Sequence, residues 1–187
     1  MVYIEENIWD FDLEKALGEI SEQRRETALR IRHEQGRRQC VLAYLLLKKA
    51  LREEYGITEN PLFDFGEHGK PSIRNHPDIH FNLSHCSEAV ACIVGNHPVG
   101  IDVETVKKRS EGVVHYTMNE EEIAEIEAAA DPDVAFTRLW TRKEALMKMT
   151  GSGITNDLKE VLRNNHVEIS TEVSRSRKYV LSVCSSR

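Results

Sequence analysis

Apolar side chains recur every three or four positions through the N-terminal third of the chain, which is the spacing of helices that bury one face. Two segments show this pattern, residues 12–34 and residues 37–54, and the second ends before Gly56. The apolar positions are Leu13, Ala16, Leu17 and Ile20 in the first segment and Val41, Leu42, Leu45, Leu46 and Ala50 in the second. The pattern therefore predicts two helices before residue 56.

The spacing changes between residues 62 and 104, where short apolar runs are separated by turn-forming residues. These runs predict strands over residues 79–83, 89–94 and 99–103. The last two flank the sequence Gly95-Asn96-His97-Pro98, so we expect them to form a hairpin.

Helical spacing returns in the C-terminal half. Asn119 followed by Glu122 is the signature of a capping box, which predicts a helix over residues 120–130. A further helix is expected over residues 133–149, and residues 167–184 alternate weakly, which indicates two more strands. Helices followed by strands, twice along the chain, indicate an α+β fold with two similar halves.

The composition is that of a folded protein of 187 residues, with 40% hydrophobic and 30% charged residues. The longest apolar run, residues 40–47, is far shorter than a membrane-spanning helix, and the acidic N-terminus does not resemble a targeting signal. We therefore expect a cytoplasmic protein that does not cross a membrane. The four cysteines have no paired spacing, which favours structural thiols over disulfides or a zinc site.

The net charge of -6 argues against nonspecific nucleic-acid binding as the main activity. The charge is unevenly distributed, because residues 24–52 contain nine arginines and lysines and only two acidic residues. This segment is either a solvated helix face or an electropositive rim for an anionic ligand or partner.

Two carboxylates fall on one face of the strand predicted near residues 99–103. Side chains alternate along a strand, so Asp102 and Glu104 project together while Ile101 enters the core. A hard cation such as Mg²⁺ is a common way to relieve repulsion between neighbouring carboxylates, because it takes oxygen ligands. An exposed hydrophilic face is the alternative.

The helix expected over residues 133–149 places three chemically different side chains on one face. Trp140, Glu144 and Lys148 are four residues apart, and the tryptophan argues against full exposure of that face. Glu144 is a candidate third metal ligand beside the strand carboxylates. The alternative is a surface Glu–Lys pair.

Two shorter motifs add polar groups at turns. Ser84 and His85 follow a predicted strand, where ligand-binding groups often collect, and Lys70 lies in the tight turn Gly69-Lys70-Pro71. Each motif alone is a weak signal.

The ordered combination of these motifs resembles the 4'-phosphopantetheinyl transferase superfamily. The resemblance spans residues 37–150 and rests chiefly on Gly100-Ile101-Asp102-Val103-Glu104 and on the segment from Trp140 to Lys148. The upstream motifs point to the longer, Sfp-like branch, in which two similar α+β halves form a pseudodimer with the active site between them. By this resemblance, residues 1–98 would grip the nucleotide of coenzyme A, and residues 99–187 would hold the metal site and the catalytic helix.

The resemblance implies Mg²⁺-dependent transfer of the phosphopantetheine arm of coenzyme A to a serine of an apo acyl or peptidyl carrier protein, with release of adenosine 3',5'-bisphosphate. Asp102, Glu104 and Glu144 would hold the metal. Glu144 or the metal-bound water that it orients would take the serine proton, and Lys148 would stabilise the leaving phosphate.

The resemblance also implies a set of residues that bind coenzyme A: Arg38, Lys70, Ser84 and His85. Arg24 or Arg25 would meet the 3'-phosphate, and Glu120 resembles a further acidic residue of the family. Two halves in one chain make a monomer sufficient. The carrier could belong to fatty acid, polyketide or nonribosomal peptide synthesis.

Two other functions remain open at this stage. One is a different Mg²⁺-dependent phosphoryl or nucleotidyl transferase. The other is a catalytically silent module that binds carrier proteins, which is disfavoured because the three carboxylates and Lys148 are all present.

Overall fold

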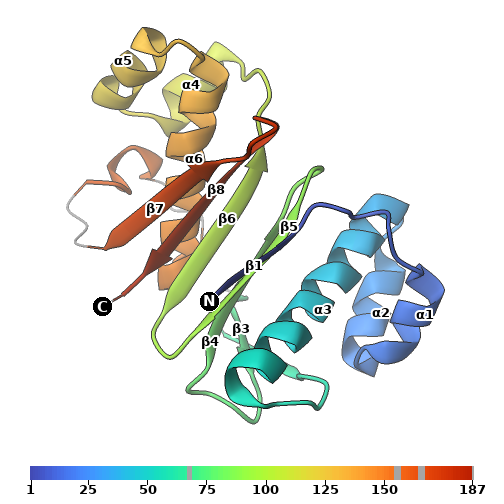
Figure 1. Cartoon of the computed structure of the whole chain (residues 1–187). Helices are drawn as coiled ribbons and strands as arrows, with labels where there is room; N and C mark the ends of the chain where they lie inside the picture. The colour runs from blue at the N-terminus through green and yellow to red at the C-terminus, as the bar shows by residue number, and fades with distance from the viewer. Residues whose placement is uncertain (67–68, 154–156, 164–166, 187) are drawn as a thin grey trace.

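The computed structural model describes residues 1–66, 69–153, 157–163 and 167–186 and has a mixed α+β architecture, as predicted. Two three-stranded antiparallel sheets lie beside each other, and each is covered by one long helix (Figure 1). No helix in the described part of the chain has the length and apolar character needed to cross a membrane.

The N-terminal sheet has the strand order β1-β5-β4, formed by Val2–Glu5, Val90–Gly95 and His80–His85. Helix α3 (Glu34–Tyr55) packs on this sheet. Helices α1 (Leu13–Glu19) and α2 (Glu22–Arg30) lie on the side of α3 that faces away from the sheet (Figure 1). A small ribbon of β2 (Phe63–Phe65) and β3 (Pro71–Ile73) precedes β4. The core of this half is apolar and includes fully buried residues of α3 such as Val41 and Leu47.

The C-terminal sheet has the order β6-β8-β7, formed by Val99–Thr105, Tyr179–Ser185 and Glu168–Val173. Helix α6 (Pro132–Thr150) packs along it, while α4 (Glu111–Thr117) and α5 (Glu120–Ala128) lie at one end (Figure 1). A short 3-10 helix, η1 (Leu158–Glu160), follows α6.

Both sheets are built in the same order along the chain. A first strand precedes the long helix, a hairpin of two strands follows, and the last strand inserts between the other two, giving β1-β5-β4 and β6-β8-β7. The N-terminal half adds α1, α2 and the β2–β3 ribbon to this scheme.

Side chains, rather than a backbone ladder, join the two sheets where β4 meets β6. The Asn82 side-chain oxygen accepts a hydrogen bond from the Ile101 amide at 2.9 Å, and the Ser84 hydroxyl accepts one from the Val103 amide at 3.1 Å. Both acceptors are buried, so they satisfy backbone donors that would otherwise lack partners. This junction brings the motif at residues 81–85 against the motif at residues 100–104.

Two predicted elements are wrong. The segment 12–34 is not one helix, because Ser21 begins a new helix by accepting a hydrogen bond from the Arg24 amide, and α3 already begins at Glu34. The expected hairpin across 95–98 is absent, because β5 pairs with β1 and β4 and has no free edge, while β6 pairs with β8.

Other predictions are confirmed. The long helices α3 and α6 form, the capping box of Asn119 and Glu122 begins α5, and two strands occupy residues 168–185. All four cysteines are buried free thiols. The sequence pattern did not predict β1, the β2–β3 ribbon or α4, which are short segments of three to seven residues.

Gly100 permits the close approach of α6 to β6. A Cβ atom at this position would collide with the carbonyl oxygen of Ala145 and lie 2.7 Å from the Met149 amide nitrogen, both of which belong to the backbone of α6. The contact explains why this position needs glycine and how α6 comes to lie directly over the strand that carries Asp102.

We expect Gly100→Ala to lower the free energy of unfolding by about 1–3 kcal/mol, because the helix must move away from the strand to admit the methyl group. Urea denaturation followed by circular dichroism measures this change. Gly18→Ala is the matched control, since Gly18 lies in α1 with open space around it and alanine favours helix. Equal stability of Gly100→Ala and the native protein would contradict the packing described here.

Candidate active site

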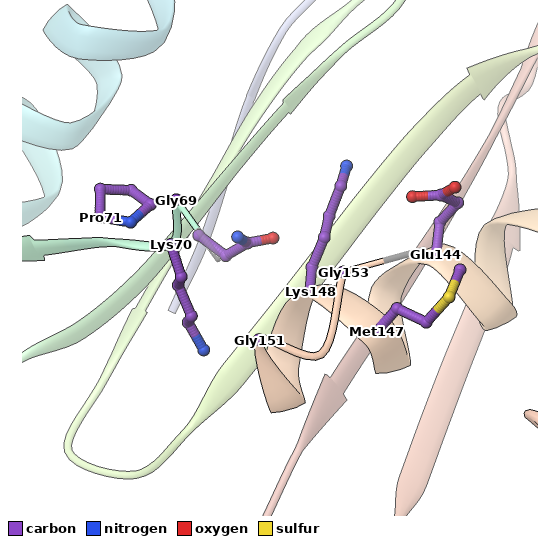
Figure 2. A pocket seen from close by; sticks show the side chains of 9 residues that line it. Gly69, Lys70, Pro71, Glu144, Met147, Lys148, Gly151 and Gly153 are labelled. Atoms are coloured by element: carbon purple, nitrogen blue, oxygen red, sulfur yellow. The ribbon is translucent and has the colours of Figure 1, made fainter. Parts of the chain in front are cut away.

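A pocket of about 230 Å³ opens between the end of α6 and the turn that precedes β3 (Figure 2). Figure 2 shows Glu144 and Lys148 projecting from α6, while the Lys70 side chain extends from the turn towards the end of α6 near Gly151. The pocket is also lined by Asn82, Gly151 and Gly153. The two halves of the chain therefore contribute to one cavity.

Lys148 forms an ion pair with Asp102 rather than with the helix neighbour Glu144. Its ammonium lies 2.6 Å from Asp102 Oδ1 and donates to the Ser84 hydroxyl at 3.0 Å. Ser84 in turn donates to the same Asp102 oxygen at 2.9 Å. This triangle joins β4, β6 and α6, and it rules out the interpretation of Lys148 as half of an exposed Glu–Lys pair.

The second oxygen of Asp102 has no hydrogen-bond partner among the described residues, although it is buried. A buried carboxylate oxygen without a partner is costly, because the oxygen has lost its hydration. The Asp102 side chain is only 4% exposed. Its free oxygen is therefore a position where a cation would be stabilised.

Glu104 and Glu144 are half-buried, and both have raised pKa values. Burial is the largest cause for each, and the negative charge of Asp102 is the next. Arg109, whose guanidinium lies 3.7 Å from Glu104, opposes the shift at Glu104, and Lys148 opposes it at Glu144. The three predicted carboxylates thus act on one another electrostatically.

Trp140, the third member of the predicted helix face, also belongs to this environment. Trp140 lowers the pKa of Glu104, which partly offsets the rise that burial causes in that carboxyl. Its ring is partly buried against the cluster that contains Phe136 and Leu139. The face of Trp140, Glu144 and Lys148 is therefore turned towards the protein.

A metal ion would fit the chemistry of this donor set. Three carboxylates, one with an unpartnered buried oxygen, match the oxygen ligands of Mg²⁺. Within the described ranges, however, no three His, Cys, Asp or Glu side chains are gathered closely enough to coordinate one ion. Lys148 instead neutralises Asp102, and the assignment of Mg²⁺ to Asp102, Glu104 and Glu144 stays a prediction.

Lys70 lines the pocket but is bound to the end of α6. Its ammonium donates to the Met149 carbonyl at 2.6 Å, which satisfies one of the last carbonyls of the helix. Burial lowers the pKa of Lys70. Lys70, which the resemblance predicts to bind phosphate, therefore also holds the turn before β3 against the end of α6.

His85 is the last residue of β4 and follows Ser84, a member of the triangle that Lys148, Asp102 and Ser84 form. Its side chain reaches the surface, yet the pKa of its ring is lowered, first because neighbouring protein displaces water and then because Lys148 and Arg24 repel the protonated form. Arg24 itself donates to the Cys40 carbonyl at 2.8 Å and 3.1 Å. Arg24 thus lies close enough to His85 to act on its charge.

Arg38 lies in a different environment from Lys70 and Lys148. It donates to Glu34 and to the Phe11 carbonyl, and its guanidinium stacks on the rings of Trp9 and Phe11 at 5.1 Å and 5.3 Å. It lines a separate polar pocket at the start of α3. The structure does not bring Arg38 into the pocket of Figure 2, and its predicted contact with coenzyme A stays untested.

Glu120, which the resemblance relates to a further acidic residue of the family, is exposed at the start of α5. The acidic residue that this helix buries is Glu122, which forms a 2.7 Å ion pair with Lys143. The sequence pattern indicates Glu122 only as a capping residue and assigns no role to Lys143. The signal for Lys143 was its place in the segment from Trp140 to Lys148, on which the family resemblance rests.

Comparison with known proteins shows that the part of the chain carrying this site is similar to a known family. The model of the 4'-phosphopantetheinyl transferase superfamily matches residues 98–186, which include β6, α6 and the C-terminal sheet. The matched region therefore contains Asp102, Glu104, Glu144 and Lys148.

Three similar proteins carry the same enzyme name. The 4'-phosphopantetheinyl transferase Sfp of Bacillus subtilis (strain 168) is 28% identical over 158 residues, covering 82% of this chain and 70% of the relative. The psf-1 protein of Bacillus pumilus is 32% identical over 74% of this chain and 61% of its own length. The gsp protein of Aneurinibacillus migulanus is 33% identical, with coverages of 72% and 57%.

Proposed function

Because the chain belongs to the 4'-phosphopantetheinyl transferase superfamily, in its Sfp-like branch, we propose that it transfers 4'-phosphopantetheine from coenzyme A to a serine of an apo acyl or peptidyl carrier protein. Adenosine 3',5'-bisphosphate is the other product. The observation that carries this proposal is the convergence of Lys148, Ser84 and Asp102 beside Glu144, at the junction of the two sheets.

The reaction breaks one phosphoanhydride bond. The carrier serine oxygen attacks the phosphorus that bears the pantetheine arm, a phosphate ester forms, and adenosine 3',5'-bisphosphate leaves with the electrons of the broken P–O bond. Catalysis of such a transfer consists mainly of positioning and of stabilising charge on the phosphate oxygens. The pocket supplies cations for this purpose in Lys70 and Lys148.

Glu144 is the proposed acceptor of the serine proton. Its raised pKa makes its carboxylate a stronger base than an ordinary glutamate, which suits proton transfer near neutral pH. Glu144 lines the same pocket as Lys70 and Lys148, the cations proposed to bind the phosphates. Lys148, one helical turn away, stabilises the negative charge that develops on the leaving phosphate.

Asp102, Glu104 and Glu144 would hold Mg²⁺, which when bound would neutralise charge on the pyrophosphate of coenzyme A. Lys148 occupies one oxygen of Asp102, and the other oxygen is free among the described residues. Arg109, in the segment after β6, forms an ion pair with Glu104, and Trp140 of α6 lowers the pKa of that carboxyl.

Lys70, Ser84 and His85 are proposed to bind the nucleotide and phosphates of coenzyme A, with Arg38 towards the adenine end. The shared β-α-β-β order of the two sheets supports a pseudodimer divided near residues 98 and 99, with the active site at the junction. We place the enzyme in the cytoplasm as a monomer, since carrier proteins and coenzyme A are both present there and one chain contains both halves.

Two alternatives make different predictions for one experiment, incubation with coenzyme A, Mg²⁺ and a panel of apo carriers. The transferase releases adenosine 3',5'-bisphosphate, detected by chromatography, only when the carrier retains its serine. A silent binding module binds carriers without releasing nucleotide. A different Mg²⁺-dependent transferase would release product without modifying any carrier, and either result would overturn the proposal.

The carrier is expected to dock on a local basic surface, because carriers of this class are acidic and the enzyme itself has a charge of -6. Lys107 and Lys108 are exposed after β6, and the neighbouring α4 exposes Val113 and Tyr116. Arg109 is less available, because it pairs with Glu104 and stacks on Phe136.

We expect charge reversal of Lys107 and Lys108 to raise the KM for the carrier in a salt-dependent way, while the affinity for coenzyme A stays the same. Steady-state kinetics at two ionic strengths measure the first effect, and calorimetric titration with coenzyme A measures the second. Lys15→Glu, an exposed reversal on α1, is the control. A loss of coenzyme A affinity instead would assign these lysines to the nucleotide site.

A further inference from the structure

Lys143 is a lysine of the catalytic helix α6 whose side chain has no exposed surface. A fully buried ammonium is rare, because removal from water is expensive unless every donor finds an acceptor. Lys143 directly precedes Glu144 in the helix, yet it does not line the pocket. The activity proposed above gives it no role.

All three donors of the Lys143 ammonium find acceptors on three other elements. One is the Thr117 carbonyl at the end of α4 (2.9 Å), one is the Glu122 carboxylate in the first turn of α5 (2.7 Å), and one is the Leu158 carbonyl of η1 (2.8 Å). Since an ammonium has three donors, this coordination is complete. Lys143 therefore fixes α4, α5 and η1 relative to α6.

Asn119 extends this network in the same direction. Its side chain accepts from the Glu122 amide, the Glu122 carboxylate accepts from the Asn119 amide, and the Asn119 side-chain amide donates to the Lys159 carbonyl at 3.0 Å. Two successive carbonyls of η1 are thus bound by side chains of α6 and of the α5 cap. The segment that begins at Asp157 is anchored at this point.

A contribution to stability alone does not explain a buried ion pair. Replacing such a pair with apolar side chains of similar size is often neutral or even stabilising, whereas removal of one partner leaves an unpaired charge. What an apolar pair cannot reproduce is the directed hydrogen bonding to the carbonyls of Thr117 and Leu158. Lys143 therefore differs from an apolar side chain in fixing the positions of these carbonyls through directed hydrogen bonds.

We propose that Lys143 is a positioning residue for the transferase site, an inference that rests on the proposed function. By binding α4, α5 and η1 to α6, it sets the orientation of the helix turn that presents Glu144. It also anchors the chain downstream of Gly151 and Gly153, which form part of the pocket wall. The lysine touches neither substrate, and it acts through the position of these groups.

The test compares three variants with the native protein. Lys143→Met leaves Glu122 buried without a cation, so it should unfold at a lower temperature. Lys143→Met combined with Glu122→Met replaces the pair with apolar side chains and should recover much of the thermal stability. Glu121→Gln, at an exposed neighbour of Glu122, is the control and should resemble the native protein.

Three readouts separate positioning from stability: the melting temperature, the dissociation constant of coenzyme A by calorimetry, and hydrogen exchange of the amides in residues 157–163. In the double apolar variant we expect recovered stability together with faster exchange. Its affinity for coenzyme A or its kcat should remain reduced by about tenfold to a hundredfold, which is the effect of losing residues that orient the ligand-binding groups without touching the ligand. Native affinity, kcat and exchange in a stable double variant would overturn the proposal.

The failure of this inference differs from the failure of the proposed function. If the native protein modified no carrier, the proposed function would be wrong. Calorimetry and hydrogen exchange would still report whether Lys143 fixes the pocket wall. If the native protein is active and the stable double variant is equally active and equally protected, only the positioning role is wrong.

Discussion

Replacing Asp102 with asparagine is expected to abolish carrier modification, with a fall of about 10³-fold or more in turnover, while the fold stays intact. Asparagine preserves the shape of the side chain and an oxygen that can accept from Lys148 and Ser84. It removes the negative charge and the free carboxylate oxygen at the position where a cation fits. The loss is therefore one of charge and not of packing.

Turnover measured from the masses of carrier proteins, circular dichroism and thermal unfolding with and without Mg²⁺ together check this prediction. Mg²⁺ should raise the melting temperature of the native protein and leave that of Asp102→Asn unchanged. The control is Asp10→Asn, which changes an exposed aspartate outside the site. If Asp102→Asn turned over normally at ordinary Mg²⁺ concentrations, the assignment of Asp102 to the site would be wrong.

The second large effect distinguishes Glu144 from Lys148, which lie one turn apart on α6. Glu144→Gln removes a proposed base and metal ligand, so turnover should fall steeply and added Mg²⁺ should restore little of it. Lys148→Ala should lower the rate by about 10² or more, because a preorganised cation is lost where charge develops. Binding of coenzyme A should weaken much less in the lysine variant.

The two variants should also differ in their affinity for divalent metal. Lys148 is the present counter-ion of Asp102, so its removal should leave the affinity for Mn²⁺ equal or increased, measured by electron paramagnetic resonance. Glu144→Gln should reduce that affinity. Native rates in both variants would show that this helix face has only a structural role.

Local patterns predicted the elements that carry the site. The alternation along residues 99–104 placed Asp102 opposite Ile101, and the helical period placed Glu144 and Lys148 on one face of α6; both placements agree with the structure. These are short-range regularities, which depend only on the repeat of a strand or a helix. The box of Asn119 and Glu122 is local in the same sense.

The partners across the fold were not predictable in this way. Lys148 could be paired with Glu144 from spacing alone, but it binds Asp102, 46 positions away in the chain. Lys70 reaches the Met149 carbonyl across 79 positions, and Lys143 collects acceptors from three elements. Such contacts depend on how the sheets and helices pack, which a single sequence does not encode in any local period.

The wrong hairpin has the same origin. Turn residues at 95–98 are compatible with a hairpin, but strand pairing is decided by which edges are free. β1, too short to be recognised, occupies the edge of β5 opposite to β4. Its pairing sends β6 into the second sheet and so creates the junction at which Ser84 and Asp102 meet.

The most direct test is the intact mass of an apo carrier protein after incubation with coenzyme A and this protein, with Mg²⁺ or with a chelator in its place. The proposed function predicts a gain equal to one phosphopantetheine group on the carrier serine, present with Mg²⁺ and absent both with the chelator and in a carrier whose serine is replaced by alanine. An unchanged carrier mass across a panel of acyl and peptidyl carriers, under conditions where the protein is folded and binds coenzyme A, would contradict it.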